Sequence, residues 1–185
     1  DISSWVFTTD PAMNVNASSM FQSATSFNQD ISLWNVERFT SMAAMFRSAT
    51  SFNQNIGSWN VTNVTNMSSM FDNANSFAFN IGNWNVGNVT NMSSMFQNAD
   101  AFNIDISGWN VSNVTSMSNM FNANNVFNQD LSNWDVSGSS PISLFEGATI
   151  CSPSGNSTIG NLFALPDAFR ASSFISSSWS TSIHW

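Results

Sequence analysis

The sequence predicts an α/β repeat solenoid in which each 25-residue coil supplies one short parallel strand and one short helix. Three observations predict this class: a tryptophan, a Met-Phe pair and a second phenylalanine each recur with the same 25-residue period. Because these series are independent and keep one register, residues 1–139 are expected to form about five to six repeats.

The repeated apolar positions define the expected core. A single unit places its apolar side chains in one flat layer, so neighbouring coils must cover that layer from both sides. We therefore expect burial of each ring against its equivalents at the core-defining positions: Trp34, Trp59, Trp84, Trp109, Trp134, Phe46, Phe71, Phe96 and Phe121. The first coil is irregular, because Trp5 and Trp34 are further apart than one repeat and the extra residues fall around Asp10-Pro11.

The expected strand lies at the tryptophan of each unit. Ile56, Trp59 and Val61 follow the pattern apolar-x-x-apolar-x-apolar, and its last part has the period of two of a short strand. If such strands pair in parallel, each coil advances the stack by about 4.8 Å.

The expected helix follows the strand. Thr65 or Asn66 can cap it, because either side chain can accept a hydrogen bond from the free amides of a first turn. The apolar residues after the cap have the spacing i, i+3, i+4 and i+7 of one helix face: Met67, Met70, Phe71 and Ala74. Asn75-Ser76 is expected to end the helix.

The charge composition excludes several classes of partner. Charged residues make up 8% of the chain, against about 25% in an ordinary domain, and the net charge is -8. Lysine is absent, and the only cations are Arg38, Arg47 and Arg170. Since phosphates need many cations, we expect no nucleic acid partner and no binding to an anionic membrane surface. A run of about 18 apolar residues is also missing, so no membrane span is expected in this chain.

The repeat resembles a known family. The unit Trp-Asn-Val-x-Asn-Val-Thr-x-Met-Ser-x-Met-Phe, as in residues 109–121, and Ser-Phe-Asn-Gln-Asp-Ile-Ser over 26–32 resemble the 25-residue repeat of BspA-like leucine-rich-repeat surface proteins. The resemblance covers roughly residues 1–137. It implies a leucine-rich-repeat-like fold, an extracellular or cell-surface location, adhesion or protein binding, and no catalytic residues.

The last part of the chain departs from the repeat. Residues 140–185 are rich in serine and show no 25-residue period. A solenoid needs an atypical terminal unit to cover its last layer, and apolar residues such as Phe163, Phe169 and Trp179 favour a C-terminal cap. The alternative is a flexible stalk or a tail that docks on another subunit.

Groups for catalysis or cofactor binding are sparse. His184 is the only histidine and Cys151 the only cysteine, so no Ser-His-Asp or Cys-His arrangement and no zinc cluster is indicated. A glycine-rich phosphate loop is absent as well. We therefore expect no catalytic residues, no metal, no cofactor and no enzymatic activity.

Two rows of polar residues follow the repeat. The row before the aliphatic position, Asp30, Asn55, Asn80, Asp105 and Asp130, suits turn residues, and a calcium ladder is disfavoured because two of its members are neutral. The row after the tryptophan points away from the core if that segment is a strand: Asn35, Asn60, Asn85, Asn110 and Asp135. These side chains either hydrogen-bond along the stack or contact a glycan or a protein.

Sequons for N-glycosylation occur in the repeats and outside them. Asn16 and Asn156 lie outside the regular coils and are the candidate glycosylation sites.

The polar surface and the family resemblance together predict a non-catalytic cell-surface or extracellular interaction and adhesion module that binds protein or glycan. The alternative is a structural subunit that self-associates into a filament or larger assembly through its coil ends or C-terminal tail.

Overall fold

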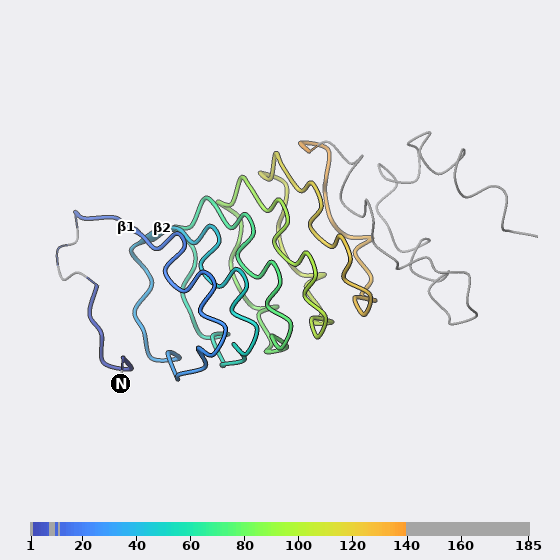
Figure 1. Cartoon of the computed structure of the whole chain (residues 1–185). Helices are drawn as coiled ribbons and strands as arrows, with labels where there is room; N and C mark the ends of the chain where they lie inside the picture. Colours follow the sequence, from blue (N-terminus) through green and yellow to red (C-terminus); the bar gives the residue numbers. More distant parts are fainter. Residues whose placement is uncertain (1, 8–9, 11, 140–185) are drawn as a thin grey trace, which may run out of the picture.

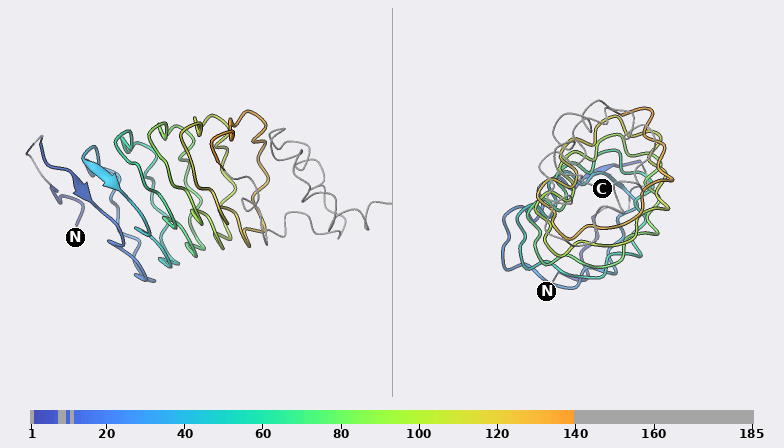
Figure 2. Two further views of the ribbon diagram at one scale, coloured as in Figure 1. Left: turned by 90° about the horizontal axis from the view of Figure 1, so that it is seen from above. Right: turned by 90° about the vertical axis from the view of Figure 1, so that its right-hand side faces the viewer.

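The computed structural model describes residues 2–7, 10 and 12–139 (Figure 1). The 25-residue units lie side by side as similar turns of chain, which overlap around a common axis when seen along the stack (Figure 2). We call these units coils 1 to 5: residues 2–30, 31–55, 56–80, 81–105 and 106–130, of which 8–9 and 11 are not described. The segment 140–185, expected as a cap or docking tail, lies outside the described residues.

Parallel pairing joins the coils along one side of the stack. Strand β1 (Val15–Asn16) pairs in parallel with β2 (Phe39–Ser41). Single parallel bridges continue the row through the later coils: Ser41 with Asn66, Asn66 with Asn91, and Asn91 with Ser116. The backbone of one short segment therefore links all five coils.

The strand expected at Trp59 and Val61 does not form there, and the pairing occurs later in the coil, at Asn66. The backbone N–H of Trp59 instead closes a turn on the carbonyl of Ile56, at 3.1 Å. The indole rings of Trp34 and Trp59 stack with their centroids 6.4 Å apart, whereas paired strands lie about 4.8 Å apart. Since the Trp59 N–H is used within its own coil, it is not available to pair with a neighbouring coil.

The helix expected over residues 67–74 is also replaced by turns, and the described residues contain no helix. Alternate backbone N–H groups donate to carbonyls of the next coil at 2.8–2.9 Å: Met67 to Asn91, Ser69 to Ser93, Phe71 to Met95 and Asn73 to Gln97. Ser69 and Asn73 have φ values of 53° and 57°, which reverse the chain locally. A helix keeps its N–H groups within its own segment, so these bonds between coils exclude it.

The repeated apolar side chains fill the centre of the stack. All nine core-defining residues are buried: Trp34, Trp59, Trp84, Trp109, Trp134, Phe46, Phe71, Phe96 and Phe121. The indole N–H of each of these tryptophans donates to an isoleucine carbonyl of the preceding coil at 2.9–3.2 Å.

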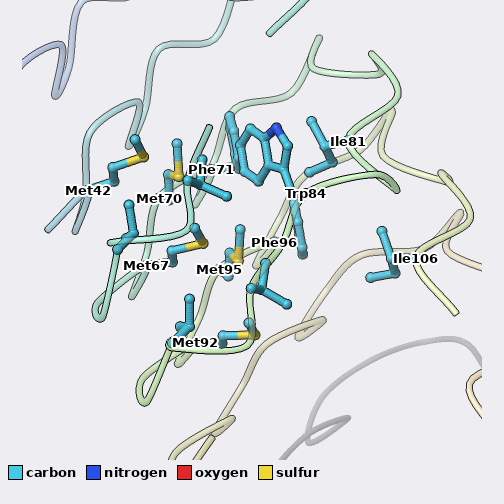
Figure 3. Close-up of a cluster of buried hydrophobic side chains, with 14 of the residues drawn as sticks. Met42, Met67, Met70, Phe71, Ile81, Trp84, Met92, Met95, Phe96 and Ile106 are labelled. Atoms are coloured by element: carbon cyan, nitrogen blue, oxygen red, sulfur yellow. The ribbon is translucent and has the colours of Figure 1, made fainter. Parts of the chain in front are cut away.

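The phenylalanines and methionines complete these layers. The rings of Phe46 and Phe71 stack at 5.7 Å. Figure 3 shows the sulfur atoms of Met67 and Met92 in equivalent places in successive layers. Flexible methionine side chains fill the irregular gaps that rigid rings leave.

Candidate functional site

The five residues that follow the repeated tryptophans form an exposed row, which we call the amide row: Asn35, Asn60, Asn85, Asn110 and Asp135. Each side-chain oxygen accepts a hydrogen bond from the backbone N–H two residues later, at 3.1–3.2 Å. This bond closes a turn of the kind that Asn and Asp favour. The row therefore faces solvent because of a local turn, and not because of the alternation of a strand.

The amide row does not form a ladder of side-chain bonds. Within residues 12–139 no hydrogen bond joins one member of the row to the next, so that alternative is not observed. The neighbouring tryptophan rings are 6.4 Å apart at Trp34 and Trp59 and 6.5 Å apart at Trp109 and Trp134. The turns fix the side-chain oxygens, and the exposed carboxamides can offer a ligand their N–H donors and the second lone pair of each oxygen.

The last member of the row is a carboxylate. The side chain and backbone N–H of Ser137 both hydrogen-bond to Asp135 and hold the pKa of its carboxyl below the usual value. Asp135 is therefore ionised at neutral pH, so the amide row ends in an acceptor while its four asparagines supply donors.

The row before the aliphatic positions consists of turn residues: Asp30, Asn55, Asn80, Asp105 and Asp130 each accept the backbone N–H two residues later at 2.8–3.2 Å. The backbone N–H groups of Ser32 and Ser107 lower the pKa of Asp30 and Asp105. In the described part of the chain, no group of three His, Cys, Asp or Glu side chains is placed to hold a metal ion.

The two candidate glycosylation sites differ in what the structure describes. Asn16 is exposed at the end of β1, and its side-chain oxygen accepts the backbone N–H of Ser18 at 2.9 Å. Asn156 lies outside the described residues, as do Cys151 and His184.

Several outward positions with distinct chemistry were missed at the sequence level. Leu33 is 86% exposed, where later coils place Ser58 or Asn83. An open hollow of about 590 Å³ lies beside it, lined by residues that include Trp5 and Arg38. Comparison of the repeats with one another would have found such positions, because an apolar residue that replaces a polar one on the surface has no role in the common core.

The chain can be compared with membrane-spanning segments and with known proteins. Among the described residues, no helix is both long and apolar enough to cross a bilayer. No curated protein and no solved structure matches the chain significantly. One family matches it twice, over residues 1–88 and 78–157, which together cover most of the sequence. The chain therefore belongs to the family described as "Mycoplasma protein of unknown function, DUF285".

Proposed function

We propose that this chain is a non-catalytic interaction and adhesion module of the cell surface or extracellular space, built as a leucine-rich-repeat-like solenoid. In this proposal the amide row binds a protein or a glycan. The resemblance of the repeat to BspA-like surface proteins supports the location and the class of function. The ligand contact rests on the structure of the amide row itself.

One observation carries the proposal. The carboxamides of Asn35, Asn60, Asn85 and Asn110 are exposed, and their oxygens are fixed by turns at 3.1–3.2 Å. Their orientation is therefore set before a ligand arrives, which lowers the entropy cost of binding. Carbonyl or hydroxyl oxygens of a peptide or a sugar chain are suitable acceptors for a row of N–H donors.

The proposal can be tested by replacing the carboxamide N–H donors of the amide row while keeping the turns that their side-chain oxygens close. The double variant Asn60→Asp/Asn85→Asp should retain the fold, because Asp135 closes the same turn with a carboxylate. The matched control Asn55→Asp/Asn80→Asp makes the same charge change in the other row, where Asp30 and Asp105 already occur. Binding is measured on an array of extracellular-matrix proteins and neutral polysaccharides. We expect at least about a tenfold loss with the first variant only; equal binding by both, or no binding by the parent chain, would contradict the proposal.

A second candidate function is the structural subunit of a filament or larger assembly. The observation that favours it is the first coil, where Trp5 is 51% exposed while its other face stacks on Trp34 at 6.0 Å. Phe21 and Phe27 of the same coil are half-buried, so this coil offers rings of the kind that other coils cover. Polymers of the purified chain in negative-stain micrographs would favour this function, and a monomer at all concentrations would exclude it.

A further inference from the structure

Two neighbouring surface rows on the phenylalanine side of the coils are polar in some coils and apolar in others. The first row is Ser26, Ser51, Ser76, Ala101 and Val126, and the second is Gln29, Gln54, Phe79, Ile104 and Gln129. Where glutamine is present in coil 2, its side-chain amide donates to the backbone and side-chain oxygens of Asn28, at 2.9 Å. Gln129 bonds in the same way to Asn103, at 3.2 and 2.9 Å. Each of these glutamines thus joins its coil to the preceding one by hydrogen bonds.

In coils 3 to 5 some of these polar groups are replaced, and Ala78 stands where the other coils have asparagine. We call the resulting cluster the apolar edge patch: Ala78, Phe79, Ala101, Ile104 and Val126. Phe79 is 37% exposed and Val126 is 42% exposed. Ala78 and Ala101 are also exposed, and Ile104 is half-buried against the core.

The members of this patch lie close together. Each patch residue lies within two residues of the buried ring of Phe77, Phe102 or Phe127, and these rings stack at 6.2 and 6.0 Å. Patch residues of successive coils are therefore about one coil apart. Folding does not require them to be apolar, because serine, asparagine and glutamine occupy the same positions in other coils.

The surroundings of the patch are acidic. Asp100 and Asp105 are exposed and directly flank Ala101 and Ile104 in the chain. Asp105 has a lowered pKa, because it accepts a backbone hydrogen bond from Ser107, so it is charged at neutral pH. No lysine or arginine occurs between residues 48 and 139. An apolar surface rimmed by carboxylates complements a partner that is both apolar and cationic.

We propose that the apolar edge patch docks a basic, amphipathic segment of another protein. Its apolar side chains would cover Phe79 and Val126, and its lysine or arginine side chains would lie beside Asp100 and Asp105. A second copy of this chain does not fit that description, because the chain has no lysine and only three arginines, and Arg47 is paired with Asp72 at 3.0 Å. The patch is separate from the amide row, so this inference does not depend on the proposed function.

The test uses a synthetic peptide of alternating leucine and lysine as the probe, with a leucine-glutamate peptide of the same length for comparison. Binding is followed by fluorescence anisotropy at physiological salt and located by methyl NMR of Ala101, Ile104 and Val126. The variant Phe79→Gln/Ile104→Gln introduces the repeat's own glutamine, so it should fold. We expect it to bind the basic peptide at least about tenfold more weakly.

The matched control is Leu33→Ser, which also replaces an exposed apolar residue with the residue of another coil, since Ser58 is its equivalent. It should bind the basic peptide as the parent chain does. Thermal unfolding checks that both variants are folded, and Val126→Ser provides a second patch variant. The proposal is overturned if the parent chain does not bind the basic peptide, if it binds both peptides equally, or if Leu33→Ser weakens binding as much as the patch variants.

Discussion

At the scale of single residues, the core accepts a polar side chain where its nitrogen and oxygen both find hydrogen-bond partners. Asn124 is buried at a position that is alanine in the other coils. Its side-chain nitrogen donates to the carbonyl of Phe102 at 3.2 Å, and its oxygen accepts the backbone N–H groups of Val126 and Phe127 at 3.2 and 3.0 Å. The cost of burying an amide is offset in this way, which no pattern of spacing reveals.

Asp72 is the buried carboxylate of the described residues, and it leads to a prediction about pH. Burial raises the pKa of Asp72, and the guanidinium of Arg47 partly opposes that rise. Since the folded-state pKa lies above the unfolded value, this group stabilises the fold below the unfolded pKa, and that contribution is lost as pH rises through the folded pKa. The variant Asp72→Asn places an amide where coil 4 has Gln97. We expect it to lack the pH-dependent contribution of Asp72 to the free energy of unfolding.

The measurement is the thermal midpoint of the parent chain and of Asp72→Asn as a function of pH, starting below pH 4. The exposed carboxylates Asp30, Asp105 and Asp135 have lowered pKa values and act in the opposite direction, losing their contribution as pH falls. They are common to both proteins, so the difference between the two curves isolates Asp72. If the parent chain gains stability over Asp72→Asn as pH rises, the ion pair with Arg47 outweighs the burial of the carboxylate.

At the scale of the element, the sequence predicted which residues face inward better than it predicted the backbone that carries them. The 25-residue period alone indicated burial of Trp59 and Phe71, because a layer of rings needs its equivalents above and below. The local spacing around them suggested a strand and a helix. Successive turns give the same inward pattern, and the bonds that distinguish them, such as Met67 N–H to Asn91, join different coils. A single unit cannot reveal these bonds.

The sequence also predicted the exposure of the amide row but not its cause, and it did not predict the apolar edge patch. Exposure of Asn60 followed from its place between Trp59 and Val61, although a turn and not a strand produces it. The apolar edge patch was missed, because its residues are ordinary apolar side chains in the sequence. Only their exposure, as at Phe79, separates them from the core.

The hydrogen bonds that the indole N–H groups donate between coils lead to a prediction about stability. The N–H of Trp84 donates to the buried carbonyl of Ile56 in the preceding coil at 3.1 Å. In Trp84→Phe that carbonyl loses its donor and the layer loses volume, so we expect the free energy of unfolding to fall by about 2–4 kcal/mol. Trp5→Phe is the control, because this half-exposed ring of coil 1 should cost less than about 1 kcal/mol. Equal losses in urea denaturation would show that the bond to Ile56 contributes little.

At the scale of the whole molecule, the stacked rings of different rows are separated by different distances. The ring centroids of Trp34 and Trp59 are 6.4 Å apart and those of Trp109 and Trp134 are 6.5 Å apart, whereas the rings of the Phe46 row are separated by 5.6–5.8 Å. Paired backbones at Asn66 and Asn91 approach to about 4.8 Å. The backbone N–H of Phe71 donates to the carbonyl of Met95 at 2.9 Å although the rings of Phe71 and Phe96 are 5.7 Å apart, so the ring spacing reflects how the rings are inclined and not how far apart the coils lie.

Because each coil contacts only its neighbours, stability should depend on whole coils in register. Deletion of residues 81–105 removes one complete repeat and brings Ile106 to the place of Ile81, so Trp109 can donate to Ile56 as Trp84 does. We expect this variant to unfold cooperatively in urea, with a lower midpoint and a smaller denaturant slope, because less surface is exposed. Deletion of residues 81–92 removes about half a repeat, a mismatch larger than the few extra residues that the first coil carries around Asp10-Pro11, so the later tryptophans and phenylalanines cannot meet their equivalents in the preceding coil. That variant should lose cooperative unfolding. If both deletions behave alike, the layers of matched rings do not determine how the coils assemble.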